Sequence, residues 1–179
     1  SLAFFTSQRL EWRHMDALFV RPAFDRVIEE TDGEVWERDA RLVDRYFEQG
    51  AGAEQPTFSV IFFTSSHHDY SFPEDRAPFQ PSLRPLDVMQ TDLRPFRQEL
   101  VNRYRNSVSY VDSLVGELVD RLAREGRLDS TRVIVTAFAA SDLHDPAGSD
   151  ANAPVPGALR ALDGRTGAAV WAADHPAWR

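Results

Sequence analysis

The stretch TFSVIFFT at residues 57–64 runs directly into SSHHDYSFPE at 65–74, and a second apolar run, RVIVT, stands at 132–136. Between them, YRNSVSYVDSLVGELVDRL at 104–122 places apolar residues three and four positions apart, which is the period of one helix face. A strand, a helix and a strand in this order predict two neighbouring parallel strands joined by a right-handed crossover. We therefore expect an α/β fold with an open sheet, whose chemistry lies at the carboxyl ends of its strands.

Shorter patterns predict the remaining elements. Residues 2–6 favour a buried strand and residues 39–49 favour a helix, whereas 24–34 are polar with turn signals. The segment 71–98 holds five prolines, which exclude regular structure across most of it. We expect the long helix to run from about 96 to 124 and to end at the glycine that follows.

The composition of the 179 residues limits the possible functions. A hydrophobic fraction of 42% and an aromatic fraction of 11% indicate a folded domain with a core. The net charge of -8 argues against nonspecific nucleic-acid binding. The absence of cysteine excludes disulfides, thiolate ligands and a cysteine nucleophile, and no apolar stretch is long enough to span a membrane. All basic residues are arginines, so an anion would have to be held by Arg, His or backbone N–H groups.

His67 and His68 stand at the end of the first long strand, next to Asp69 and Tyr70. An imidazole in this place can bind an anionic oxygen or protonate a leaving group, because it changes charge near neutral pH. The alternative is a pair of surface histidines without a chemical role. We predict His67 and His68 as the candidate catalytic residues.

Other polar residues carry weaker signals. Asn106 and Asp112 lie six residues apart on the long helix, so they do not share a face, and we interpret them as packing and surface polarity. Asp142 and His144 have a spacing that two metal ligands could use, but the residues around them favour a flexible linker. We expect neither a metal site nor a cofactor site in this chain.

The composition changes at residue 139. Residues 139–156 are rich in Ala, Asp, Gly, Ser and Pro, which predicts a linker. In 157–171, two short apolar runs flank the sequence DGRTG, a pattern that predicts a β-hairpin. The segment is similar to one repeat of a quinoprotein-type β-propeller, a fold that needs about four to eight blades. We therefore predict an α/β domain at 1–138, the linker, and a hairpin tail at 157–179 that stands outside the sheet.

Four motifs in the first part resemble the sulfatase family of the alkaline-phosphatase superfamily. They are the Phe-rich strand, the histidine loop with Tyr70 and Pro73, YRNSVSYVD at 104–112 and DSTRVIVT at 129–136. The resemblance covers about residues 1–136 and implies an alkaline-phosphatase-like open, mostly parallel sheet with flanking helices, incomplete in this chain. It also implies hydrolysis or transfer of sulfate or phosphate esters, with a divalent metal (Ca, or Zn or Mn) in the complete family domain.

The resemblance carries one site position to this chain. The register of Tyr70 and Pro73 puts His67 where family members contact the sulfate ester, and His68 is the second candidate because Asp69 replaces the usual proline. The family's nucleophile turn is missing, and so is its Gly-Asp-His-Gly metal motif after the last strand. We therefore expect a piece of a longer protein that binds no metal and is inactive alone.

Two other functions stay open. The chain could be a degenerate, non-catalytic interaction module, or part of a propeller-linked binding protein. The resemblance implies that the full-length protein is periplasmic, extracellular or membrane-attached. Its partner would be a sulfate or phosphate ester substrate, with no nucleic acid.

Overall fold

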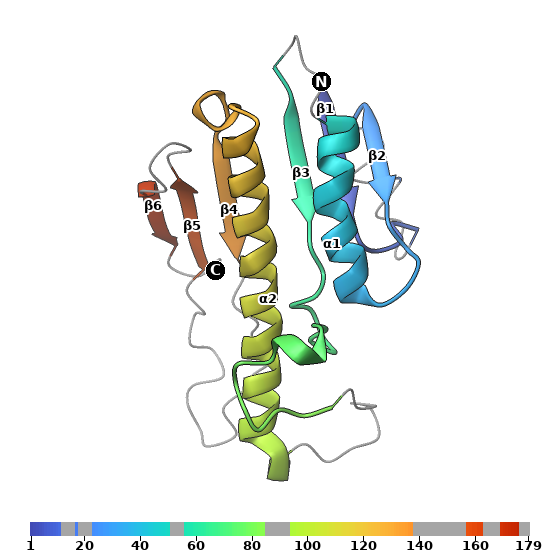
Figure 1. The fold of residues 1–179 in the computed structure, drawn as a ribbon, viewed down its shortest axis with the longest axis vertical. Helices are drawn as coiled ribbons and strands as arrows, with labels where there is room; N and C mark the ends of the chain where they lie inside the picture. Colours follow the sequence, from blue (N-terminus) through green and yellow to red (C-terminus); the bar gives the residue numbers. More distant parts are fainter. Residues whose placement is uncertain are drawn as a thin grey trace. The chain divides into compact units, whose positions relative to one another are not determined.

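The chain divides into two units, Ser1–Leu118 and Val119–Arg179, each with a three-stranded sheet of its own (Figure 1). The computed structural model describes residues 1–11, 17, 23–50, 56–84 and 94–137, and the backbone of strands at 157–162 and 169–175. The parallel sheet of the first unit and the helices beside it confirm the predicted α/β class.

Three parallel strands form the sheet of the first unit. β1 (Leu2–Thr6) lies between β2 (Arg26–Glu29) and β3 (Phe58–Phe62), and Phe4 of β1 is in register with Val27 and Val60. The sequence predicts β1 and β3. The interpretation of residues 24–34 as turns is wrong for β2, which pairs with β1 over four residues.

α1 (Val35–Arg45) covers one face of this sheet and continues as a π-helical turn at Tyr46–Gly50. Leu42 of α1 is fully buried together with Ala3 and Phe5 of β1. The helix begins before residue 39, the predicted start, because its cap lies upstream of the apolar stripe. There the carboxylate of Glu37 accepts a hydrogen bond from the backbone N–H of Glu34 (2.9 Å), as in a capping box.

α2 (Arg97–Arg124) agrees closely with the predicted long helix. Its Tyr110 and Leu114 are buried against Val43 of α1 and against Phe72, which follows β3. The Tyr110 ring packs edge-on against Trp36, with 6.3 Å between ring centroids, and its hydroxyl donates to the Trp36 carbonyl oxygen (2.8 Å). The two helices and the segment after β3 therefore share one core.

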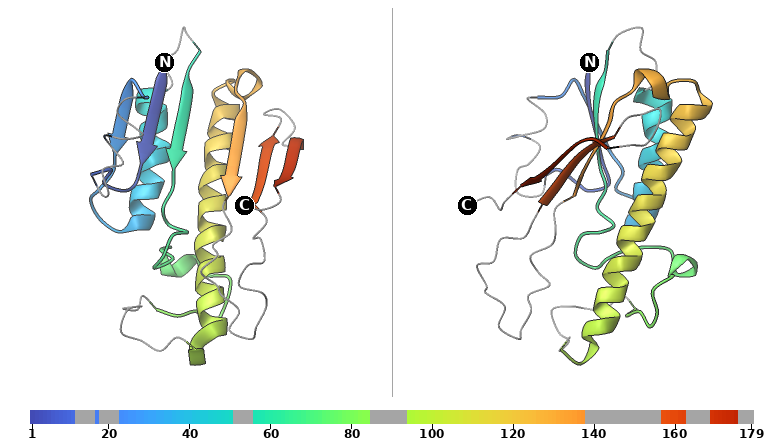
Figure 2. Two further views of the ribbon diagram at one scale, coloured as in Figure 1. Left: turned by 180° about the vertical axis from the view of Figure 1, so that it is seen from behind. Right: turned by 90° about the vertical axis from the view of Figure 1, so that its left-hand side faces the viewer.

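The second unit contains an antiparallel sheet in the order β4 (Val133–Ala137), β5 (Gly157–Leu162) and β6 (Ala169–His175) (Figure 2). Two expectations are wrong here. β3 and β4 belong to different sheets, so they are not neighbouring parallel strands. The predicted hairpin is present as β5 and β6, but β5 pairs with β4, so the hairpin is not outside a sheet. The physical reason is that β5 supplies partners for the backbone N–H and C=O groups of β4.

Removing residues 157–179 is expected to speed amide hydrogen exchange in β4, because the deletion opens a ladder of five register pairs with β5. Hydrogen exchange followed by mass spectrometry measures the change at residues 133–137. The matched control is β1, whose partners β2 and β3 remain, so its exchange should not change. Unaltered exchange in β4 would show that β5 does not protect it.

Candidate functional site

The two predicted histidines lie in a tight turn that follows β3. The N–H of His67 donates to the carbonyl oxygen of Thr64 (2.9 Å), and the N–H of Tyr70 donates to that of His67 (2.8 Å). Asp69 and Tyr70 have φ angles of 78° and 47°, in the left-handed region that most residues avoid. The turn therefore holds two strained residues directly beside the imidazoles.

The backbone at Asp69 distinguishes this turn from the family pattern described above. Proline fixes φ near −65°, so a proline could not occupy position 69 with the φ of 78° found there. Aspartate is among the residues that tolerate this conformation best. The departure from the pattern is thus a different path of the chain and not a simple exchange of one side chain.

The imidazoles of His67 and His68 differ in their partners. Both residues are exposed, and their ring centroids are 6.0 Å apart. Nδ1 of His68 lies 3.7 Å from a carboxylate oxygen of Asp69, an ion pair when the imidazole is protonated. The imidazole of His67 has no hydrogen bond or ion pair to any residue in the described part of the chain. Both ring nitrogens of His67 are therefore available to a ligand, whereas Nδ1 of His68 lies beside Asp69.

Sequence reasoning missed Asp39, which anchors the start of this turn from α1. The Asp39 side chain is fully buried and accepts hydrogen bonds from the N–H of Thr64 (3.1 Å) and of Ser65 (2.7 Å). Burial raises the pKa of the Asp39 carboxyl, although these hydrogen bonds act in the opposite direction. The signal in the sequence is an acidic residue inside the apolar stripe of a helix.

A hydroxyl pair joins the carboxyl ends of β1 and β3. Oγ of Ser7 and Oγ1 of Thr64 are 2.5 Å apart, and either can donate. Arg38 of α1 donates from Nη1 to the carbonyl oxygen of Ser7 (3.1 Å). The ends of the two neighbouring strands are thus fixed to each other and to α1, which gives the histidine turn a rigid base.

Arg103 of α2 is the second residue that sequence reasoning missed. Its side chain is 7% exposed, and Nε donates to the carbonyl oxygen of Asp69 (2.8 Å) while Nη1 donates to that of Leu83 (2.8 Å). The guanidinium carbon lies 5.0 Å from the centroid of the Phe72 ring, and Nη1 lies 3.7 Å from a carboxylate oxygen of Glu74. No local pattern in the sequence indicates these contacts.

Two asparagines of α2 hold the far part of the same loop. Asn106 is fully buried, and its side chain accepts from the N–H of Phe79 (2.9 Å) and donates to the Phe79 carbonyl oxygen (3.0 Å). Asn102 donates to the carbonyl oxygen of Pro81 (2.9 Å). The packing interpretation is right for Asn106, but surface polarity describes only Asp112, which is exposed.

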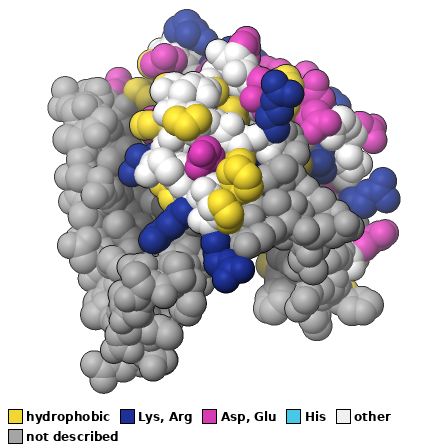
Figure 3. Space-filling view, turned by 90° about the horizontal axis from the view of Figure 1, so that it is seen from below, with side chains coloured by type: hydrophobic (Ala, Val, Ile, Leu, Met, Phe, Trp, Pro, Cys, Tyr) yellow, Lys and Arg dark blue, Asp and Glu magenta, His cyan; other side chains and the backbone are white. Residues whose placement is uncertain are grey.

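Several other arginines are held by carboxylates. Arg41 and Arg45 pair with Glu30 at 3.0 and 2.6 Å. Burial alone would raise the pKa of Glu30, but the hydrogen bonds and charges of Arg45 and Arg41 lower it. In the space-filling view from below, Lys/Arg and Asp/Glu side chains are interspersed on the described part of the face that is drawn (Figure 3).

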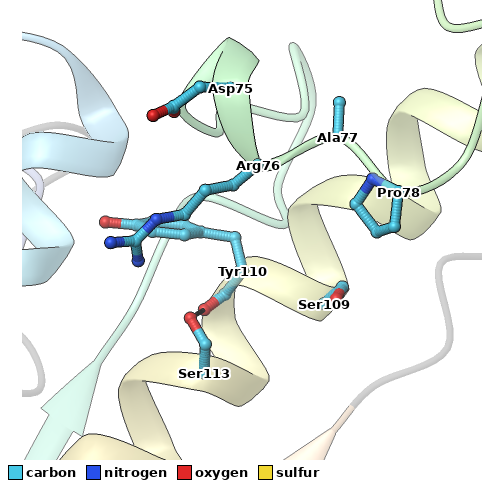
Figure 4. A pocket seen from close by; sticks show the side chains of 7 residues that line it. All are labelled: Asp75, Arg76, Ala77, Pro78, Ser109, Tyr110 and Ser113. Atoms are coloured by element: carbon cyan, nitrogen blue, oxygen red, sulfur yellow. Dashed lines mark hydrogen bonds between the residues drawn. The ribbon is translucent and has the colours of Figure 1, made fainter.

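An open cavity of about 420 Å³ lies between α2 and the short helical turn Glu74–Arg76 (Figure 4). It is lined by Asp75, Arg76, Ala77, Pro78, Ser109, Tyr110 and Ser113. Burial raises the pKa of Tyr110 to about 12, so this phenol is neutral near pH 7, and Ser113 donates back to the Tyr110 carbonyl oxygen (2.6 Å). The lining contains no imidazole, which favours the histidine turn as the candidate site.

The described residues do not fit a metal centre. Among them, no group of three or more His, Asp or Glu side chains lies close enough together to hold a metal ion. Asp142 and His144, the pair with metal-ligand spacing, lie outside the described residues.

The family follows from a comparison with protein-family models. The model described as "Sulfatase" matches residues 7–137, which is most of the chain. The chain belongs to the sulfatase family. The match includes the histidine turn, α2 and β4, and it ends before the hairpin, so it gives no support to the propeller resemblance of 157–171.

Solved structures agree on the fold. A protein in the alkaline phosphatase superfamily from Vibrio parahaemolyticus is 23% identical, with a TM-score of 0.57, over 87% of this chain and 35% of its own. The C-terminal periplasmic domain of EcEptC from Escherichia coli is 16% identical, with a TM-score of 0.52, over 75% of this chain and 37% of its own. The sulfatase-family chain thus spans about a third of the length of these structures. No curated protein matches it.

Within the described ranges, no helix combines the length and the apolar character that a membrane-spanning segment needs.

Proposed function

We propose that this chain carries the substrate-facing histidine turn of a sulfatase-family hydrolase or transferase that acts on sulfate or phosphate esters. The observation that carries the proposal is the exposed imidazole of His67, which has no polar partner among the described residues and follows the carboxyl end of a parallel strand. Parallel α/β sheets bind their ligands at these strand ends.

The chemistry of an imidazole suits such an ester. A protonated ring can donate a hydrogen bond to a non-bridging oxygen, or pass its proton to the leaving-group oxygen as the ester bond breaks. His68 is the second candidate, since the nearby carboxylate of Asp69 can orient its ring through Nδ1 and leave Nε2 for the ester. We expect the divalent metal of the family to be held by residues that do not belong to this chain.

We also propose that the full-length protein works outside the cytoplasmic membrane. EcEptC, one of the structures with the same fold, is represented by a periplasmic domain. Fractionation of the source cells, followed by detection of the protein with an antibody, would locate it.

The proposed function can be tested by titrating the protein with phenyl phosphate and phenyl sulfate while following the imidazole NMR signals. We expect the His67 signals to shift in a saturable way in the native protein and in His68→Ala. In His67→Ala, we expect the remaining imidazole signals, including those of His68, to show no saturable shift. We expect no release of phenol by residues 1–179 alone with added Ca²⁺, Zn²⁺ or Mn²⁺. If neither imidazole responds to either ester, the non-catalytic interaction module is favoured instead.

A further inference from the structure

We infer that Arg103 is a positioning residue, which holds the His67–Tyr70 turn in a backbone conformation that a proline at position 69 would not allow. A role of this turn in catalysis rests on the proposed function, in which His67 meets the substrate. The positioning itself is argued from the hydrogen bonds of Arg103.

The turn needs an external support. Residues in sparsely populated backbone regions destabilise a fold unless the surrounding structure holds them, and the turn contains two in succession, Asp69 and Tyr70. Two backbone hydrogen bonds close the turn, from the N–H of Tyr70 to the carbonyl oxygen of His67 and from the N–H of Ser71 to that of Ser65 (2.9 Å), but neither uses the carbonyl oxygen of Asp69, which accepts from Arg103 instead.

Arg103 supplies that partner although its guanidinium loses contact with water. Burial lowers the pKa of the Arg103 guanidinium, because the charged form is less well solvated there. The charge of Glu74 and the ring face of Phe72 offset part of the cost. One planar group then reaches the carbonyl oxygens of both Asp69 and Leu83 at 2.8 Å, a geometry that needs the forked donors of arginine.

Asn102 provides a matched control. It lies one residue before Arg103 on α2, is also buried, and donates to the carbonyl oxygen of Pro81 in the same loop. It therefore contributes to holding the loop but does not touch the histidine turn. A general loss of loop packing would affect both variants alike, whereas a positioning role belongs to Arg103 alone.

The experiment compares Arg103→Met and Asn102→Ala by amide hydrogen exchange and by the imidazole NMR signals, without any ester present. We expect Arg103→Met to speed exchange at the Tyr70 amide by about 10–100-fold, since hydrogen bonds to charged groups contribute roughly 1.5–3 kcal/mol. We also expect the His67 ring signals to move. Asn102→Ala should leave both readouts unchanged. The Thr64 and Ser65 amides, bonded to Asp39, report whether each variant is folded.

A rescue variant separates positioning from packing. Glycine adopts a positive φ without strain, so Asp69→Gly added to Arg103→Met should return the Tyr70 exchange rate and the His67 signals most of the way to the values of Asp69→Gly alone. If Arg103→Met does not fold, Arg103→Lys replaces it, because lysine keeps the charge but cannot reach both carbonyl oxygens with a rigid fork.

The inference is overturned if Asn102→Ala disturbs the turn as much as the Arg103 variant, or if Asp69→Gly gives no rescue. These readouts need no substrate. If Arg103→Met disturbs the turn but no imidazole signal shifts when the esters are added, the proposed function is rejected and the positioning role of Arg103 is kept.

Discussion

Replacing His67 by alanine in the full-length protein is expected to lower ester turnover by about 10²–10⁴, the range for losing a positioned acid or base. His67 is preferred to His68 because its imidazole has no polar partner in the described part of the chain, whereas His68 lies beside Asp69. Steady-state rates with an aryl sulfate and an aryl phosphate measure the effect.

The matched control is His68→Ala, which changes the neighbouring imidazole in the same turn. We expect it to keep most of the activity. The reverse outcome, full activity in His67→Ala and collapse in His68→Ala, would move the role by one residue.

Replacing Asp39 by alanine is expected to lower the free energy of unfolding by about 2–4 kcal/mol. The substitution leaves the N–H groups of Thr64 and Ser65 without their acceptor, and an unsatisfied buried polar group costs roughly 1–3 kcal/mol. Urea unfolding of both proteins measures the difference. Asp112→Ala serves as the control, since it removes an exposed carboxylate from a helix and should change stability by less than about 0.5 kcal/mol.

The direction of the pKa shift of Asp39 predicts how the stability of the native protein changes with pH. Because the pKa of Asp39 is raised in the folded protein, its contribution to stability is greatest below the unfolded pKa, about 4, and falls as the pH rises through the folded value. The side chain at position 39 of the Asp39→Asn variant cannot ionise. The free energy of unfolding of the native protein, relative to that of this variant, should therefore fall as the pH rises from the unfolded pKa to the folded pKa of Asp39, and should not change with pH below the unfolded pKa. A difference that is constant across this pH range would mean that the carboxyl titrates normally.

Most elements of the first unit were predictable because each has a strong local pattern. β1 and β3 are apolar runs, and α2 repeats apolar residues at helical spacing. β2 escaped prediction because only Val27 and Ile28 are apolar and charged residues flank them. The early start of α1 was in principle readable, since Glu34 and Glu37 form part of a capping signal upstream of the apolar stripe.

The pairing of strands was not predictable in the same way. The order β2-β1-β3 and the pairing of β4 with β5 depend on contacts between segments far apart in the chain, and no local pattern encodes them. For the candidate site, the sequence indicates the two histidines at a strand end. It does not indicate Asp39 or Arg103, because their partners are backbone atoms that every residue possesses.

The loop after β3 is held through its backbone atoms, so its side chains are not needed for these contacts. Three side chains of α2 form hydrogen bonds with the backbone of the loop, at residues 69, 79, 81 and 83. They are Arg103, Asn106 and Asn102. Side chains in the loop can therefore be exchanged without breaking these hydrogen bonds, as long as residue 69 keeps its positive φ and residue 79 keeps its N–H. Related proteins could therefore carry other side chains in this loop while the hydrogen bonds from α2 to its backbone stay the same.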